Sequence, residues 1–158
     1  MAFDEKYFST HTYANITFAQ YSMYWWSNRF FATLAKRHGR RGARLLEVGS
    51  GMGHLVGQLS AEFEAYGMDL NHWAVNKSKE YSEKASLQTA SAQELPYQDG
   101  AFNVVIIKHI VEHVPDPAKA LNEIGRVTEK DGILSLATPN LGSLLKPWKG
   151  EKWIGYQD

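Results

Sequence analysis

Short apolar runs alternate with longer amphipathic stretches along most of this chain. The apolar runs predict strands at residues 43–48, 64–68, 87–90, 101–107 and 133–137. The stretches that separate several of them predict helices at residues 54–60, 71–81 and 116–127. This alternation is typical of an α/β protein with a parallel sheet, right-handed crossovers, helices on both faces and ligands at the carboxyl ends of the strands.

Before the first strand, residues 14–38 predict one long aromatic helix. Apolar side chains recur there at helical spacing, at Met23, Trp26, Phe30 and Leu34. Polar side chains fall on another face, at Ser22, Arg29 and Lys36. The pattern predicts that most of the neighbouring large rings are core residues: Trp25, Trp26, Phe30 and Phe31.

The first strand ends in a glycine-rich turn within the segment RLLEVGSGMGH, residues 44–54. Glycines at alternate positions, Gly49, Gly51 and Gly53, allow positive φ and a close approach of the backbone to a ligand. A dinucleotide fingerprint, GxGxxG, needs a further glycine three residues after the second, and neither possible frame contains one. The spacing therefore disfavours a nicotinamide dinucleotide.

Asp69 stands at the tip of the second predicted strand, twenty residues after Gly49. A carboxylate at that position can accept hydrogen bonds from both hydroxyls of an adenosine ribose. NAD also contains such a ribose, so this residue does not by itself separate the two cofactors.

Bulk composition narrows the choice of partners. The chain has 158 residues, 17 basic and 17 acidic, so no net charge attracts nucleic acid or an anionic membrane. It contains no cysteine, which excludes disulfides and thiolate chemistry. We find no signal-peptide pattern and no apolar run near the ~20 residues of a membrane span. These features predict a cytoplasmic protein that acts on a small molecule.

The pattern ExGxGxG, from Glu47 to Gly53, resembles the first motif of class I S-adenosylmethionine-dependent methyltransferases. The resemblance continues in order through residues 91–105, 111–117 and 123–127 to the segment ATPN at 137–140. It departs from the family pattern at Ser91 and Asn103, where an aspartate is usual, and at residues 129–132, where a proline and two glycines are usual.

The resemblance implies a Rossmann-like, doubly wound parallel sheet of about five strands in the order 3-2-1-4-5. It implies S-adenosyl-L-methionine as the cofactor, with the adenine near Ser91 and the backbone N–H of Ala92. It also implies that Tyr13, Tyr21 and Tyr24 belong to an N-terminal lid over the cofactor and acceptor. The complete predicted cofactor-binding set is Glu47, Gly49, Gly51, Gly53, Asp69, Ser91, Ala92 and Lys108.

Three residues after the fourth predicted strand are candidates for the chemical step: His109, Glu112 and His113. Any of them could remove a proton from the acceptor or position it. A narrower resemblance is to the O-methyltransferases of ubiquinone biosynthesis, whose matching segment ExxEHV binds a divalent metal in some members. This chain has HxxEHV and no evident fourth ligand, so we predict no metal.

The family fold normally continues past the fifth strand with a helix and two more strands. Only 20 residues follow Thr138, too few for those elements. We therefore expect the last two strands to be missing, which predicts a lid at 1–42, a cofactor-binding core at 43–138 and an irregular tail at 139–158. An uncovered fifth strand predicts a homodimer through the sheet edge.

The leading hypothesis is methyl transfer from S-adenosylmethionine to a small-molecule acceptor. One alternative is an NAD(P)-dependent oxidoreductase, which the glycine spacing disfavours. A second alternative is a non-catalytic cofactor-binding or assembly domain. Titration with S-adenosylhomocysteine and NADH, followed by turnover assays, separates the three.

Overall fold

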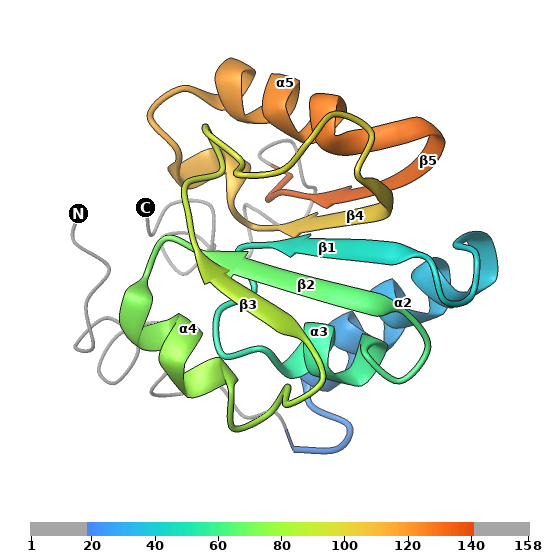
Figure 1. Ribbon diagram of the computed structural model, residues 1–158. Helices are drawn as coiled ribbons and strands as arrows, with labels where there is room; N and C mark the ends of the chain where they lie inside the picture. The colour runs from blue at the N-terminus through green and yellow to red at the C-terminus, as the bar shows by residue number, and fades with distance from the viewer. Residues whose placement is uncertain (1–18, 141–158) are drawn as a thin grey trace.

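The computed structural model describes residues 19–140. Within them, five parallel strands form one sheet in the order β3-β2-β1-β4-β5, which is the order that the family resemblance implies (Figure 1). The strands are β1 (Arg44–Val48), β2 (Glu64–Asp69), β3 (Ser86–Thr89), β4 (Phe102–Lys108) and β5 (Thr128–Ala137). The helices are α2 (Met23–His38), α3 (His54–Leu59), α4 (His72–Ser78), the 3₁₀ turn η1 (Val111–His113) and α5 (Pro117–Val127).

Two hydrophobic clusters hold helices against opposite faces of the sheet. On one face, Ala120 and Ile124 of α5 pack over strand residues that include Val105. On the other face, Phe31 and the small Ala35 of α2 pack with α3 against residues of β1 and β4. Side chains alternate between faces along a strand, so the apolar run of β4 serves both clusters.

The helix ends follow the capping rules that the sequence indicates. The side chain of Asn71 accepts a hydrogen bond from the backbone of Ala74 at the start of α4, at 3.0 Å. Asp116 caps α5 in the same way, and Pro117 occupies its first turn. These caps fix where the helices leave the ends of β2 and β4.

The first helix differs from its prediction in both position and orientation. It begins at Met23, because Ser22 is the N-cap and accepts a hydrogen bond from Trp25, while residues 14–18 lie outside the described part. Trp26 and Phe30 are 51% and 59% exposed, so the prediction that most of the large rings are core residues is wrong. The buried stripe is Phe31, Ala32 and Ala35, because small alanines let the helix approach the sheet closely.

The fifth strand also starts earlier than predicted. It follows α5 directly at Thr128, and residues 129–132 lie inside the strand as an irregularity, where the register with β4 shifts. Asp131 has a φ of 66°. A bulge of this kind accommodates extra residues without ending the strand.

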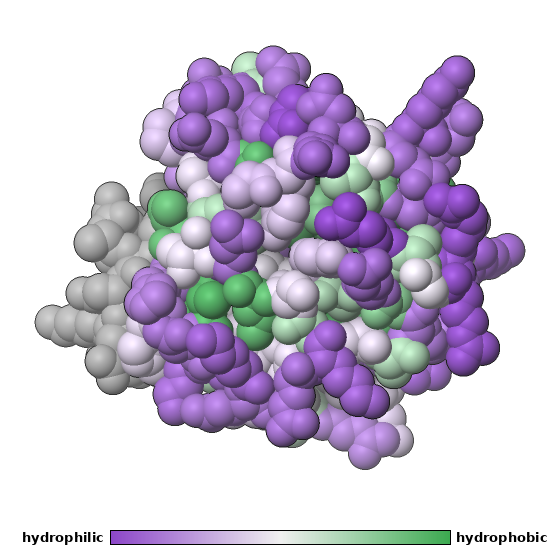
Figure 2. All heavy atoms as spheres, viewed as in Figure 1, coloured by the Kyte–Doolittle hydropathy of each residue, from purple (hydrophilic) through white to green (hydrophobic). Residues whose placement is uncertain are grey.

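The visible outer surface is mainly hydrophilic, and hydrophobic residues show only as small, separate patches (Figure 2). Among the described residues, no helix has both the length and the apolar content needed to cross a membrane.

Candidate cofactor and active site

The ends of three strands bring the predicted site residues together at one edge of the sheet. Val48, the last residue of β1, is level with Met68 of β2 and with Ile107 of β4. Gly49, Asp69 and Lys108 each follow one of these paired residues. The carboxyl edge of the sheet therefore has the glycine turn at its centre, at the point where the strand order reverses.

The glycine turn has the backbone geometry that its sequence predicts. Gly49, Gly51 and Gly53 all have positive φ, at 75°, 51° and 78°. An added Cβ would lie only 2.2 Å from the side chain of Ile110 at Gly49, and 2.7 Å from that of Ser78 at Gly53. Both positions therefore require glycine for space as well as for conformation.

Asp69 connects the second strand to this turn. One carboxylate oxygen accepts a hydrogen bond from the backbone N–H of Gly51, and the other accepts one from Asn71, both at 2.9 Å. Burial raises the pKa of Asp69, and the surrounding backbone N–H donors oppose that rise. Each oxygen keeps a lone pair for a further donor, as recognition of a ribose diol requires.

Glu47 lies buried below the turn and is only 2% exposed. Its Oε1 is 3.5 Å from Nζ of Lys108, while its Oε2 has no hydrogen-bond partner. Burial raises the pKa of Glu47, and the ammonium of Lys108 opposes that rise. A buried oxygen without a hydrogen-bond partner can accept a hydrogen bond from a bound ligand.

Lys108 also joins the sheet to the first helix. Its Nζ donates a hydrogen bond to the side-chain oxygen of Asn28 at 2.8 Å and lies 5.6 Å from the ring centroid of Phe31. Asn28 in turn lines a cavity of about 210 Å³ between α2 and α3, together with Trp25, Arg29, His54 and Gln58. The sequence did not predict this link, because it joins residues 80 positions apart.

Ser91 and Ala92 begin the segment between β3 and β4. The Ser91 hydroxyl accepts a hydrogen bond from the backbone N–H of Gln93. The backbone carbonyl of Ser91 accepts another from the backbone N–H of Glu94. Ala92 is buried in the cluster below α5. The two residues therefore lie in a closed turn beyond the end of β3, next to the end of β2.

The three candidates for chemistry lie beyond β4 on one short segment. His109 has a φ of 53°, an uncommon left-handed conformation for a residue with a side chain. Its Nδ1 is 3.4 Å from Oε1 of Glu112, and its side chain is 57% exposed. Glu112 accepts a hydrogen bond from Thr138, and His113 is half-buried in η1. The structure thus places His109 beside Glu112, whose Oε1 has no hydrogen-bond partner among the described residues.

The described residues contain no group of three or more histidine, aspartate or glutamate side chains arranged to hold a metal ion. Tyr13 lies outside the described residues, and Tyr21 is an exposed residue just before α2.

The fold and the site together define a class I, Rossmann-like domain with a nucleotide-type cofactor site at the topological switch point. Comparison with known proteins gives the family: residues 46–136 match the family described as a methyltransferase domain, and the chain belongs to it. Members of this class use S-adenosylmethionine as the methyl donor.

Individual relatives agree with this assignment. The chain is 31% identical over 126 residues to a ubiquinone/menaquinone biosynthesis C-methyltransferase of Geotalea uraniireducens, covering 72% of this chain and 53% of the relative. It is 29% identical to the chloroplastic tocopherol O-methyltransferase of Arabidopsis thaliana, covering 83% of this chain and 42% of the relative. The chain spans about half the length of the curated relatives it matches.

Among solved structures, the YcgJ protein of Bacillus subtilis has the same fold. The two chains superpose with a TM-score of 0.61 and 25% identity, covering 67% of this chain and 49% of YcgJ.

Proposed function

We propose that this protein transfers a methyl group from S-adenosylmethionine to a small-molecule acceptor. One arrangement carries the proposal: the positive-φ glycine turn is hydrogen-bonded through Gly51 to Asp69, above the buried carboxylate of Glu47. The bound donor supplies an activated methyl group on a sulfonium centre. The chain binds and orients it through the predicted set, with Asp69 at the ribose and Ser91 and Ala92 at the adenine.

Calorimetric titration tests the cofactor assignment. We expect S-adenosylmethionine and S-adenosylhomocysteine to bind at one site, and NADH not to bind in a parallel titration. Absence of binding by both sulfur compounds would refute the proposal. Binding without turnover over a panel of acceptors would favour the alternative of a non-catalytic cofactor-binding domain.

The names of two relatives indicate which kinds of acceptor to include in the assay panel. One is named as a C-methyltransferase of ubiquinone and menaquinone biosynthesis and another as a tocopherol O-methyltransferase. We propose an acceptor of comparable kind, a small organic molecule with a carbon or oxygen nucleophile. A radiolabelled methyl group on the donor identifies the product without prior choice of the acceptor atom.

We propose that His109 removes the proton from the acceptor and that Glu112 orients its ring. The Nδ1 atom lies 3.4 Å from Oε1 of Glu112, an oxygen without a hydrogen-bond partner among the described residues, so a small closing movement would let this oxygen accept the Nδ1–H and leave Nε2 for the acceptor. H109A is expected to lower kcat at least tenfold and to leave the affinity for S-adenosylhomocysteine unchanged. H38A, at an exposed histidine in the last turn of α2, is the control and should leave kcat unchanged. An equal loss of kcat in both variants would contradict the assignment to His109.

We further propose that two copies of the chain pair along β5. This strand lies at the edge of the described sheet, and its Leu134 and Leu136 are 45% and 40% exposed. An open edge offers backbone N–H and C=O groups to a second strand. Sedimentation equilibrium should show a dimer that L136K weakens, whereas M23K, at an exposed apolar residue of α2, should not change it. A monodisperse wild-type monomer would contradict this proposal.

A further inference from the structure

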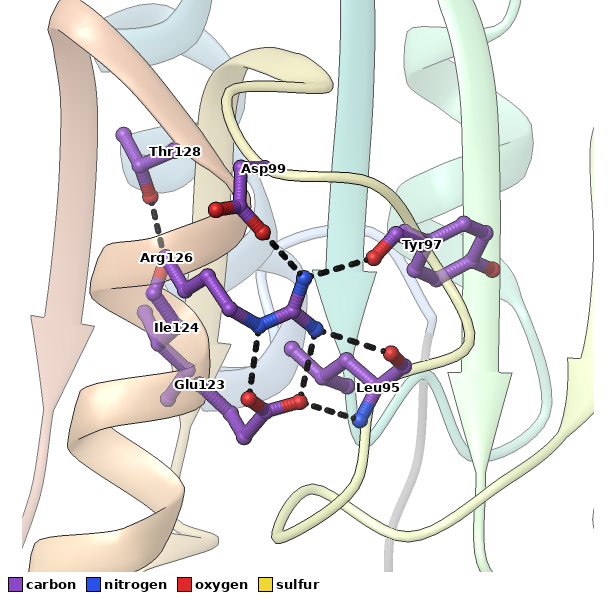
Figure 3. Close-up of polar contacts among 7 residues, drawn as sticks. All are labelled: Leu95, Tyr97, Asp99, Glu123, Ile124, Arg126 and Thr128. Carbon is purple, nitrogen blue, oxygen red and sulfur yellow. Dashed lines mark hydrogen bonds and ion pairs between the residues drawn. The ribbon is translucent and has the colours of Figure 1, made fainter.

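Arg126, in the last turn of α5, uses all five N–H groups of its guanidinium in hydrogen bonds (Figure 3). Nε and one Nη2 hydrogen reach the two carboxylate oxygens of Glu123, at 2.7 and 2.8 Å. The other Nη2 hydrogen reaches the backbone oxygen of Leu95 at 3.0 Å. Nη1 donates to the backbone oxygen of Tyr97 and to the side chain of Asp99, both at 2.8 Å. One side chain thus fixes three positions of the segment between β3 and β4.

Glu123 completes the attachment from the other side. Its Oε2 accepts a hydrogen bond from the backbone N–H of Leu95 at 2.8 Å. The N–H and the C=O of Leu95 are therefore both held by this pair, and the Leu95 side chain is buried in the core cluster. We call the Arg126–Glu123 pair and its bonds to Leu95, Tyr97 and Asp99 the loop clamp.

The loop clamp lies directly after the turn that begins with Ser91 and Ala92. Glu94 donates its backbone N–H to the oxygen of Ser91 at 3.1 Å, and the two residues form an antiparallel bridge. These contacts close the turn, and the chain leaves the turn at Leu95, the residue after Glu94. The position of the Ala92 N–H is consequently fixed by β3 on one side and by the loop clamp on the other.

Glu123 and Arg126 carry opposite charges near neutral pH, which favours the loop clamp. The hydrogen bonds from Arg126 lower the pKa of Glu123 to about 2, and those from Glu123 and Asp99 raise the pKa of Arg126. The folded pKa of Glu123 lies below its ordinary value of 4.5, so its stabilising contribution is complete above that pH and is lost as the pH falls toward 2.

We propose that Arg126 and Glu123 are positioning residues for adenine recognition, which they control by holding the Ser91–Ala92 turn in place. The inference rests on the proposed function, because it takes Ser91 and Ala92 as the adenine contacts. The Ala92 N–H suits the N1 acceptor of adenine. Hypoxanthine has a hydrogen on N1, so a correctly placed turn discriminates between the two bases.

The test compares S-adenosylhomocysteine with S-inosylhomocysteine in wild type, R126K and E123A. Wild type should bind the adenine compound at least tenfold more tightly. R126K keeps the charge but loses the planar five-donor fork, so it should reduce this ratio at least fivefold. E123A removes the acceptor of the Leu95 N–H and should act in the same direction. R40K, at the exposed Arg40–Glu129 pair, is the matched control and should leave the ratio unchanged.

Each outcome decides a separate point. Failure of wild type to bind S-adenosylhomocysteine refutes the proposed function itself. If wild type binds both compounds equally, or if the variants weaken both by the same factor, the positioning role is overturned while the proposed function stands.

Hydrogen exchange can be measured on the wild-type protein, so this test does not depend on whether a variant folds. Coupling between two sites is reciprocal, so a loop clamp that strengthens cofactor binding must itself be stabilised by the cofactor. Saturating S-adenosylhomocysteine should slow exchange of the Leu95 amide at least fivefold. An unchanged rate would overturn the proposal.

Discussion

D69N is expected to weaken the binding of S-adenosylhomocysteine about 100-fold, equivalent to ~2.7 kcal/mol. The two oxygens of Asp69 accept hydrogen bonds from the backbone of Gly51 and Asn71. In D69N, the amide NH₂ must face one of these N–H donors, and the charge that strengthens bonds to the ribose hydroxyls is lost. The loss therefore combines a distorted turn with a weaker ribose contact.

Calorimetry measures the change in affinity for this variant. D131N is the matched control, because Asp131 lies in the β5 irregularity and asparagine tolerates its positive φ. We expect D131N to bind as wild type does. An affinity of D69N within threefold of wild type would exclude Asp69 from the ribose site.

The pH dependence of binding gives a second check on Asp69. Burial raises its pKa above the ordinary value of 3.8, and the ionised form is the one that accepts both hydroxyl protons. Affinity should therefore fall as the pH decreases through the raised pKa, and this dependence should be absent in D69N. Stability of the free protein has the opposite sign, because the folded state binds the proton more tightly than the unfolded state. The contribution of Asp69 to stability is present below pH 3.8 and is lost as the pH rises through the folded pKa.

G49A is expected to abolish measurable cofactor binding and to destabilise the fold by more than the ~1–2 kcal/mol of a left-handed non-glycine residue. The added Cβ would lie 2.2 Å from Ile110 Cδ1, so the Ile110 side chain, the turn or the segment after β4 must move. Urea unfolding measures the stability, and calorimetry measures the binding.

Gly42 provides a control with the same backbone conformation and no crowding. Its φ is 77°, and nothing lies within 4 Å of an added Cβ. G42A should lose only the conformational ~1–2 kcal/mol and should bind the cofactor normally. The double variant G49A/I110A should recover part of the stability lost in G49A, because the colliding side chain is removed. Equal effects of G42A and G49A would show that crowding at Ile110 is unimportant.

The local sequence predicted the parts of this fold that depend on short-range chemistry. The run of apolar residues before Gly49, the capping side chains of Asn71 and Asp116, and the alternation of strands and helices act within a few residues. They predicted the five strands, their parallel direction and the glycine turn correctly. Strand order came from the resemblance to a known family, and the structure confirms it.

Errors arose where packing between distant elements decides the outcome. Trp26 and Phe30 have helical spacing that is typical of a buried stripe, yet they are exposed. The residues of α2 that are buried against the sheet include Ala32 and Ala35 instead, because a helix packs closely where its side chains are small. Periodicity shows that a helix has an apolar stripe but does not identify which face meets the sheet.

By itself, the sequence determined the class of fold and the glycine turn, and it predicted a set of cofactor-binding residues. Tertiary structure alone decided that Lys108 lies between Glu47 and Asn28, and that Arg126 holds Leu95. The physical reason is the same in both cases. These contacts join segments many residues apart, and only the packing of strands and helices fixes which donors meet which acceptors.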